Sequence, residues 1–135
     1  MRSGTATAFG VDLFKSLRFT KDNFLSIALQ NEALIDNLTP EEQIRFCCRF
    51  MGITDIEVTL EDILTKFNLR LCSNIITRRC SNVQRKSLSL ALSLIGHSKI
   101  VLLDEPTAGM DISSKREIWE LIRAHKKNRI IIVAT

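Results

Sequence analysis

The sequence has no apolar stretch long enough to cross a lipid bilayer. Its longest uncharged stretch, residues 87–98, spans 12 residues and is interrupted by serine, glycine and histidine. A transmembrane helix needs about 20 apolar residues. The N-terminal sequence Met-Arg-Ser-Gly-Thr also lacks the apolar segment of a secretory signal. We therefore expect neither a membrane-spanning helix in this chain nor its export.

Cysteine is scarce, and its spacing does not indicate a metal site. Cys47, Cys48, Cys72 and Cys80 form no C-x-x-C pair and have no H-x-x-x-H partner. The common zinc-binding patterns are therefore excluded. We expect reduced thiols of a cytosolic protein, some of them packed in the core.

Charge of one sign is not concentrated either. The formal net charge of +4 is mild, and no dense basic stripe indicates a nucleic-acid partner. With 45% hydrophobic and 25% charged residues, the composition excludes a disordered or low-complexity chain. The length of 135 residues fits one compact domain or part of a larger one.

Short apolar runs alternate with helical patterns, which predicts an α/β fold. Residues 24–29 are expected to form a buried strand that leads into a loop. Residues 100–103 and 130–134 are apolar throughout, which is typical of strands buried on both faces of a parallel sheet.

The best-defined predicted helix begins after Thr39. Thr39 is a suitable N-cap, Pro40 suits the first helical position, Glu42 completes a capping box, and Gly52 ends the helix. A second helix is expected near residues 60–67. A third runs from Ser81 to Gly96, after an irregular segment at 68–81, and a fourth is capped by Ser113 or Ser114.

Two adjacent carboxylates follow the apolar strand at 100–103. Asp104 and Glu105 are therefore expected at the carboxyl edge of a parallel sheet, where α/β proteins place ligands. Asp104 can hold Mg²⁺ directly or through water, and Glu105 can polarise a water for attack on a γ-phosphate. The alternative is a charged turn after a strand, but the complete string Leu-Leu-Asp-Glu-Pro-Thr-Ala-Gly-Met-Asp is much more specific.

That string resembles the Walker B motif and D-loop of ATP-binding-cassette (ABC) ATPases. The following Arg-x-x-Trp-Glu-Leu-Ile and the strand at 130–134 most resemble the A subfamily of ABC transporters, largely lipid exporters. Residues 4–10 resemble the short strand after the P-loop helix. Residues 29–34 and 37–39 resemble the Q-loop and its exit.

The resemblance implies an α/β, P-loop NTPase-like fold with a mainly parallel sheet. In this division, residues 38–96 form a helical, signature-bearing subdomain, and residues 4–30 and 97–135 form parts of the catalytic core. ATP and Mg²⁺ are the implied cofactors.

The same resemblance implies a role for individual residues. Gln30 would sense Mg²⁺ and the attacking water, and Asp104 would support the metal. Glu105 would be the general base. Asp111, in the D-loop, would reach toward a partner subunit. Ser81 and Gln84 would contact nucleotide from the signature motif.

The sequence departs from the family in that signature motif. Residues 80–84, Cys-Ser-Asn-Val-Gln, stand where the family has Leu-Ser-Gly-Gly-Gln. Val83 places a β-branched side chain where the family has only a hydrogen, so this face is expected to be weak or inactive. The nearby basic residues attract phosphate or form a solvated helix face; they are Arg78, Arg79, Arg85 and Lys86.

Two further family features are missing from the sequence. It has no Gly-x-x-x-x-Gly-Lys-Ser/Thr motif. The family has its switch histidine just after the position that corresponds to Thr135, and His97 and His125 are poor substitutes for it. We expect both histidines to be solvated or packed, and the strand at 100–103 to lack one row of partners beside an absent P-loop strand. The isolated chain, a partial domain, is then expected neither to bind nor to hydrolyse ATP.

The resemblance implies the function of a nucleotide-binding domain that powers transport, with lipids as the expected cargo, at the cytoplasmic face of a membrane. Its partners would be a second nucleotide-binding domain and the transmembrane domains, contacted by residues 30–38. One alternative is the head of a non-transport ABC ATPase, but the coiled-coil heptads or basic stripes of such proteins are not visible. The other is a catalytically dead module that pairs with an intact ABC subunit through residues 40–67 and the signature face.

Overall fold

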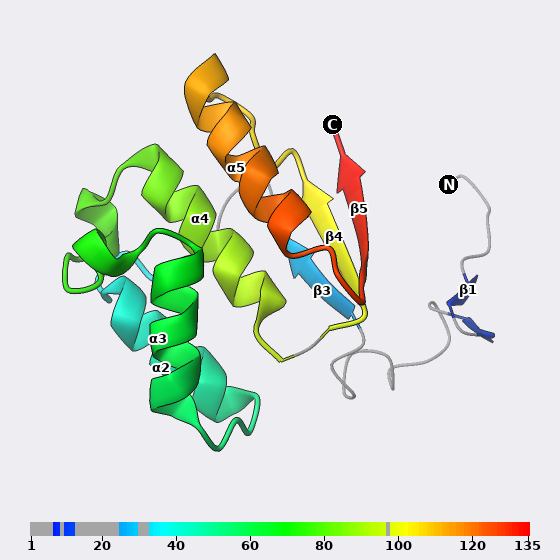
Figure 1. Ribbon diagram of the computed structural model, residues 1–135, viewed down its shortest axis with the longest axis horizontal. Coiled ribbons are helices and arrows are strands. Elements are labelled where there is room, and N and C mark those ends of the chain that lie inside the picture. The colour runs from blue at the N-terminus through cyan, green and yellow to red at the C-terminus, as the bar shows by residue number, and fades with distance from the viewer. Residues whose placement is uncertain (1–6, 9, 13–24, 30–32, 97) are drawn as a thin grey trace.

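The computed structural model describes residues 7–8, 10–12, 25–29, 33–96 and 98–135 of the chain. A three-stranded parallel sheet lies against two helices, and a second group of helices extends from them (Figure 1). This arrangement confirms the α/β class predicted from the sequence.

The sheet has the order β3-β4-β5, with β3 at Leu25–Ala28, β4 at Ile100–Asp104 and β5 at Ile130–Ala134. All pairs are parallel. The expectation that residues 100–103 lack one row of hydrogen-bonding partners was wrong, because β3 and β5 flank β4 on both sides.

The two faces of the sheet are covered differently. On the inner face, Val101 and Leu103 of β4 are buried. On the outer face, Ile27, Leu102 and Ile132 are paired in one row across the three strands, and the two isoleucines are 55% and 53% exposed. The predicted burial on both faces is therefore wrong for β5, and β3 is only partly buried, because the described helices cover a single face.

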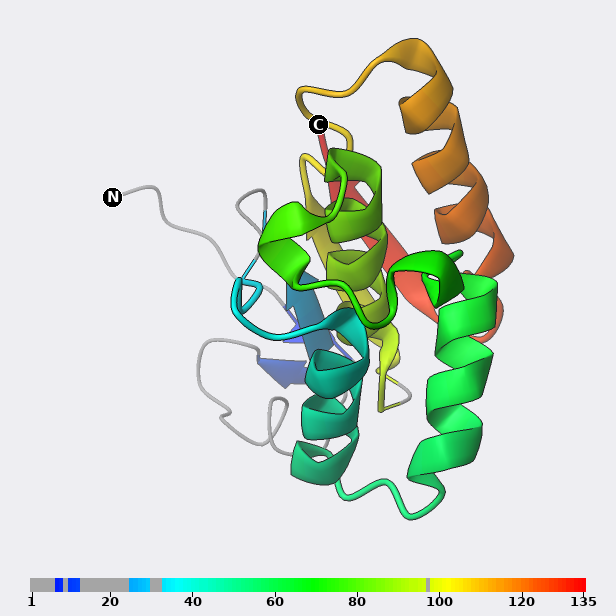
Figure 2. The same cartoon turned by 90° about the vertical axis from the view of Figure 1, so that its left-hand side faces the viewer.

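Helices α4 (Asn82–Leu94) and α5 (Ile112–Ala124) cover the inner face. Both pack beside the sheet in the two views, and α4 runs opposite to the strand direction (Figures 1 and 2). The amino end of α4 therefore lies toward the same side of the molecule as the carboxyl end of β4.

Helices α2 (Pro40–Phe50) and α3 (Ile56–Lys66) form the second group. The predicted capping box of α2 is confirmed: the Glu42 N–H donates to Thr39 Oγ1 at 3.2 Å, and the Thr39 N–H donates to Glu42 Oε2 at 2.8 Å. Gly52 follows the helix with a φ of 71°, as its predicted role at the end of the helix requires.

The connection between α3 and α4 is irregular, as predicted. It contains the 3₁₀ turns η1 (Arg70–Cys72) and η2 (Thr77–Arg79). Near the N-terminus, β1 (Thr7–Ala8) and β2 (Val11–Asp12) form an antiparallel pair. Most of the segment at 4–10 that resembles a family strand lies outside the described residues.

The start of α5 differs from the prediction. Asp111, rather than Ser113 or Ser114, is the N-cap, because its carboxylate accepts hydrogen bonds from the Ser114 N–H at 3.0 Å and the Ser114 hydroxyl at 2.6 Å. The two serines therefore belong to the first turn of the helix.

One hydrophobic core joins the helices to the inner face of the sheet. No helix among the described residues has the length and apolar character needed to span a bilayer. The buried members of the core include one or more residues from each of the major helices and from β4: Ile44, Leu60, Leu64, Leu88, Ala91, Val101, Leu103, Ile118 and Ile122.

The four cysteines are free thiols, as the sequence predicts. Cys48 and Cys72 are fully buried in the core. Burial raises the pKa of the Cys72 thiol to about 11, and the neighbouring Cys80 adds to this shift. At neutral pH, Cys72 is therefore protonated and serves as an apolar packing group.

Candidate functional site

Asp104 and Glu105 lie where β4 leaves the sheet. Asp104 is the last residue of the central strand and is exposed, whereas Glu105 begins the following turn and is partly buried. The Glu105 N–H donates to the Ala134 carbonyl at the end of β5, at 2.8 Å. This hydrogen bond fixes the first residue of the turn against the neighbouring strand, so both carboxylates are held at the carboxyl edge of the sheet, as predicted.

The backbone of Glu105 is strained. Its φ is 45°, in the left-handed region that costs a residue with a side chain about 1–2 kcal/mol. The other described residues that combine a side chain with a positive φ are Asn68 and Asn128, and asparagine adopts this region readily. Glutamate does not make this turn more stable than asparagine or glycine would, which points to a role for its carboxylate.

The turn continues directly into the cap of α5. The Ala108 N–H donates to the Glu105 carbonyl at 3.1 Å, and the Met110 N–H donates to the Thr107 carbonyl at 3.4 Å. Hydrogen bonds from Ser114 lower the pKa of the Asp111 carboxyl from its usual value. Asp111 is therefore an ionised helix cap, a use that the sequence interpretation did not foresee.

Ser81 and Gln84, the residues that resemble part of a signature motif, form the reciprocal cap of α4. The Gln84 N–H donates to Ser81 Oγ at 3.2 Å, and the Ser81 N–H donates to Gln84 Oε1 at 2.8 Å. Ser81 is thus the N-cap, which agrees with the prediction that a helix starts from this residue. Val83 is accommodated in the first turn, where its side chain is partly buried against the hydrophobic core.

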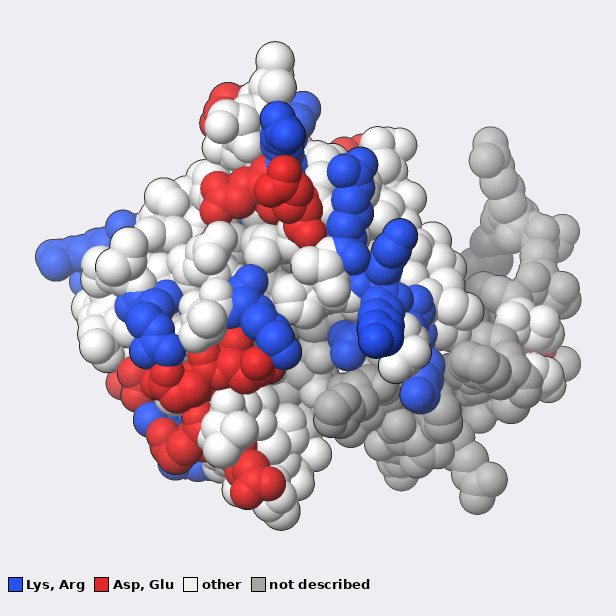
Figure 3. Space-filling model, in the orientation of Figure 1, with Lys and Arg blue, Asp and Glu red and all other residues white. Residues whose placement is uncertain are grey.

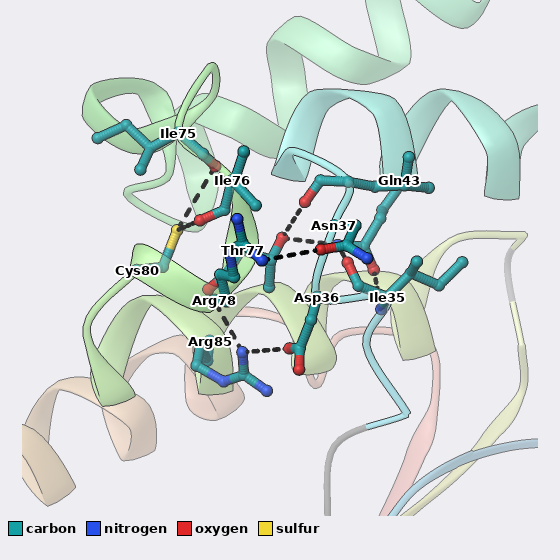
Figure 4. Close-up of polar contacts among 11 residues, drawn as sticks. Ile35, Asp36, Asn37, Gln43, Ile75, Ile76, Thr77, Arg78, Cys80 and Arg85 are labelled. Carbon is teal, nitrogen blue, oxygen red and sulfur yellow. Dashed lines mark hydrogen bonds and ion pairs between the residues drawn. The ribbon is translucent and has the colours of Figure 1, made fainter.

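A buried polar network connects the residues before α2 to those before α4 (Figure 4). Gln43 is 4% exposed; its amide nitrogen donates to Thr77 Oγ1 at 2.7 Å and to the Ile35 carbonyl at 3.1 Å. Its amide oxygen accepts from the Ile35 N–H at 3.0 Å. Thr77 in turn donates through its hydroxyl to the Leu38 carbonyl at 2.6 Å.

Two arginines extend this network to the surface. Arg85 donates to Asp36 Oδ1 at 2.7 Å and to the Thr77 carbonyl at 3.3 Å, and Arg78 donates to Asn37 Oδ1 at 3.3 Å (Figure 4). Neither interpretation of the basic cluster, phosphate attraction or a merely solvated face, included these contacts. No periodic pattern in the sequence indicates these contacts, because Asp36 and Arg85 are 49 positions apart.

Several predicted site residues remain outside this description. Gln30 and His97 lie outside the described residues. His125, at the end of α5, stacks on Phe67 with ring centroids 4.4 Å apart, so the prediction of a packed histidine is confirmed for this residue. A hollow of about 20 Å³ next to Asp104 is lined in part by Ala28, Leu29 and Lys86, which places the end of β3 near Asp104.

The carboxylates fit a magnesium ion better than the chain fits a nucleotide. Mg²⁺ is usually held by one or two carboxylates together with phosphate oxygens and water, and Asp104 offers an exposed carboxylate at the sheet edge. A triphosphate also needs a cradle of backbone N–H groups and a lysine, and the sequence contains no Gly-x-x-x-x-Gly-Lys-Ser/Thr. The carboxylate pair could therefore take part in holding a metal ion, whereas the sequence lacks that motif's phosphate cradle.

Known proteins share this sequence pattern. The ABC transporter family model matches residues 2–108. ATP-binding cassette sub-family A member 7 of Mus musculus is 33% identical over 135 residues, covering 98% of this chain and 6% of that protein. The glucosylceramide transporter ABCA12 of Homo sapiens is 39% identical over 108 residues, covering 78% and 4%, respectively. The phospholipid-transporting ATPase ABCA7 of Homo sapiens is 34% identical over 134 residues, covering 98% and 6%.

The family match extends over most of the described structure. It runs through β3, the helices α2 to α4 and the pair Asp104–Glu105. The chain spans only about 4–6% of the length of the three relatives. On the family match and these identities, the chain belongs to the ABC transporter family and is similar to members of its A subfamily.

Proposed function

We propose that this chain is part of an ATP-hydrolysing nucleotide-binding domain that powers membrane transport. The observation that carries the proposal is the carboxylate pair at the end of the central strand, with Glu105 kept in a strained turn. In this proposal residues 38–96 form the helical subdomain, and residues 4–30 and 97–135 belong to the catalytic core.

Asp104 and Glu105 have different tasks in this proposal. Asp104 would hold Mg²⁺ directly or through a water, and MgATP bound there would supply a phosphorus centre open to attack by water, with ADP as the leaving group. A Glu105 carboxylate oxygen accepts the proton of that water, which makes the water a better nucleophile. Gln30, directly after the β3 region, orients the same water and metal.

The other motif residues face a second nucleotide-binding domain. Ser81 and Gln84 shape the amino end of α4, whose N–H groups and dipole favour an anionic phosphate bound on the partner. Asp111 lies in the turn that approaches the same partner. Residues 30–38 contact the transmembrane domains at the cytoplasmic face of the membrane, and the names of two relatives support a lipid as the cargo.

A chimaera tests the hydrolytic role in a complete protein. The region of human ABCA7 that matches this chain is replaced by the chain, and ATP turnover is measured in the purified transporter. We expect measurable turnover that Glu105→Gln lowers by about a hundredfold or more, since a positioned general base contributes about 10²–10⁴-fold. Turnover that survives Glu105→Gln would contradict the assignment of the base.

A second change separates chemistry from backbone strain. Glu105→Asn places a residue suited to a positive φ in the turn, so the free energy of unfolding of the 135-residue chain is expected to rise by about 0.5–1 kcal/mol. Turnover of the chimaera should fall with the same substitution. A loss of stability would show that the turn needs glutamate for structural reasons.

The isolated chain is expected to be inactive. Without the Gly-x-x-x-x-Gly-Lys-Ser/Thr motif it lacks the usual grip on the triphosphate. The purified chain should show no ATP turnover above that of its Glu105→Gln variant. Turnover that is lost with Glu105→Gln would contradict this part of the proposal.

A catalytically dead pairing module is the second candidate function. The observation in its favour is that Ser81 and Gln84 cap each other, while Val83 occupies a family glycine position and packs on the core. This candidate predicts that the chain binds an intact nucleotide-binding domain equally well with and without ATP. Capture that requires ATP would contradict it, and a chimaera activated only by Asn82→Gly with Val83→Gly would support it.

A further inference from the structure

A groove lies at the end of the molecule opposite the carboxylate pair. It has a volume of about 370 Å³, within the range of about 300–1,000 Å³ that small-ligand sites occupy. It lies between α3 and the carboxyl ends of α4 and α5, and in both views these ends point away from the end of β4 (Figures 1 and 2). The groove is therefore separate from the proposed site of hydrolysis.

Most of the groove wall is apolar. The aromatic part of the wall is the stacked pair Phe67 and His125, and the His125 Nδ1 atom is hydrogen-bonded to the Leu121 carbonyl at 2.8 Å. The aliphatic part of the wall comes from α3 and from the end of α4: Val58, Ile63, Ala91, Leu94 and Ile95. Such a surface favours the apolar body of a ligand over a hydrated polar molecule.

One cationic group in the wall, Arg129, has no anionic partner among the residues that the structure describes. Arg129 is partly buried, and its Nη1 atom donates to the Leu94 carbonyl at 3.3 Å. Among the described residues, no carboxylate lies within ion-pair distance of Arg129. Burial lowers the pKa of Arg129, but a guanidinium remains charged at neutral pH. This desolvated charge is available to an anion.

The other charges at the groove do not cancel Arg129. Asp62 also lines the groove, but Lys66 Nζ is 2.7 Å from its carboxylate and compensates it. Basic side chains gather over the end of α5 and the turn into β5 (Figure 3). That stretch, residues 123–129, contains Arg123, Lys126, Lys127 and Arg129 and no acidic residue.

We propose that this groove binds a small amphipathic anion, an apolar body of medium length that ends in a single carboxylate. The apolar body lies against Phe67 and the aliphatic wall, and the carboxylate pairs with Arg129. A triphosphate nucleotide does not match this site, because its polar groups would face the apolar wall.

Decanoate is a suitable probe, and decanol is its uncharged control. The purified, ¹⁵N-labelled 135-residue chain is titrated with each compound, and amide shifts are followed by NMR. We expect saturable shifts with decanoate for residues 58–67, 91–96 and 125–129. Decanol should bind about tenfold more weakly, because it cannot form the charge-assisted hydrogen bond to Arg129.

Two pairs of variants test the residues involved. Arg129→Gln should weaken decanoate binding about tenfold, whereas Arg116→Gln, which removes an exposed arginine paired with Glu120, should leave it unchanged. Val58→Glu places a negative charge on a groove residue that is 71% exposed and should also weaken binding. Leu71→Glu is its control, since Leu71 is 93% exposed and lies outside the groove.

The outcomes are distinct from those for ATP hydrolysis. Far-UV circular dichroism verifies that each variant is folded, and the exposed position of Val58 keeps the test usable if Arg129→Gln unfolds. Equal affinity for decanol and decanoate, no saturable shift, or binding that is insensitive to both groove variants would overturn the proposal. Loss of turnover with Glu105→Gln would leave it unaffected.

Discussion

The helical part of the molecule, residues 33–96, and the three-stranded sheet differ in how completely polar groups are hydrogen-bonded and apolar side chains are buried. Both α2 and α4 begin with reciprocal capping boxes, and Gln43 is buried with both the oxygen and the nitrogen of its amide hydrogen-bonded. The sheet instead exposes the outer isoleucines Ile27 and Ile132, although its inner face is buried.

This difference indicates where the stability of the chain resides. Contacts in the helical part are internal to the described structure, so they are expected to contribute fully to folding. The outer row of the sheet is only half removed from water and contributes less of its apolar area. The carboxylate pair belongs to the sheet, so the candidate site is attached to the less completely covered part of the molecule.

The largest contrast is expected from matched truncations of isoleucine. Ile44→Ala should lower the free energy of unfolding by about 2–5 kcal/mol, because Ile44 is 0% exposed in the core of the helical part. Ile132→Ala should cost less than about 1 kcal/mol, because this side chain is 53% exposed. Urea denaturation of the two variants measures both values. Equal losses would show that the outer face of the sheet is covered in solution.

The buried amide of Gln43 should have the next largest effect. Gln43→Ala removes three hydrogen bonds and leaves polar groups of Ile35 and Thr77 without this partner, so we expect a loss of about 2–3 kcal/mol. Thr77→Val tests one of these bonds alone and should cost less. If Gln43→Ala unfolds at the same urea concentration as the unmodified chain, the network does not anchor residues 35–38.

Helix caps should give a smaller and more even effect across the two parts. Thr39→Ala and Ser81→Ala each remove the side-chain oxygen of a capping box, at a cost of about 1 kcal/mol. Asp111→Ala removes the cap of α5 beside the sheet and should cost a similar amount. Thermal unfolding measures all three, and a negligible effect at Ser81 alone would show that the start of α4 is held by other contacts.

The smallest expected effect is the loss of stability at low pH. Hydrogen bonds lower the pKa of Asp111 from its usual 3.8 and that of Glu42 from its usual 4.5. A carboxyl whose folded pKa is depressed stabilises the fold above its unfolded pKa, and that stabilisation is lost as the pH falls through the folded pKa.

Variants of these two carboxyls locate the effect. Asp111→Asn keeps a good N-cap but cannot titrate, so its melting temperature should fall less between neutral pH and about pH 3 than that of the unmodified chain. Glu42→Gln provides the same measurement in the helical part. An unchanged pH dependence in both variants would show that other carboxyls govern acid unfolding.

Local signals in the sequence were sufficient for the helices of the helical part. The cap at Thr39, the stop at Gly52 and the start of a helix at Ser81 each depend on a few neighbouring residues, and the structure confirms all three. The start of α5 was misplaced because three residues close together, Asp111, Ser113 and Ser114, are of types that can cap a helix. Only the observed hydrogen bonds from Ser114 to Asp111 decide among them.

Contacts between distant segments could not be predicted in this way. The pairs Asp36–Arg85 and Gln43–Thr77 join residues 49 and 34 positions apart, and no periodicity links them. The neighbours of β4 were also predicted wrongly, because an apolar strand sequence does not state which strands flank it. The sequence also does not indicate that the backbone of Glu105 has a positive φ.

The sequence by itself determined the element types, the order of helices and strands, and the family, because these depend on local patterns and on one specific acidic motif. Only the tertiary structure decided that β4 is central and that one face of the sheet stays partly exposed. It also decided that Arg129 lines an apolar groove and forms no ion pair with a carboxylate of the described residues. These properties depend on which distant segments are in contact, and those contacts are determined by long-range packing rather than by local sequence patterns.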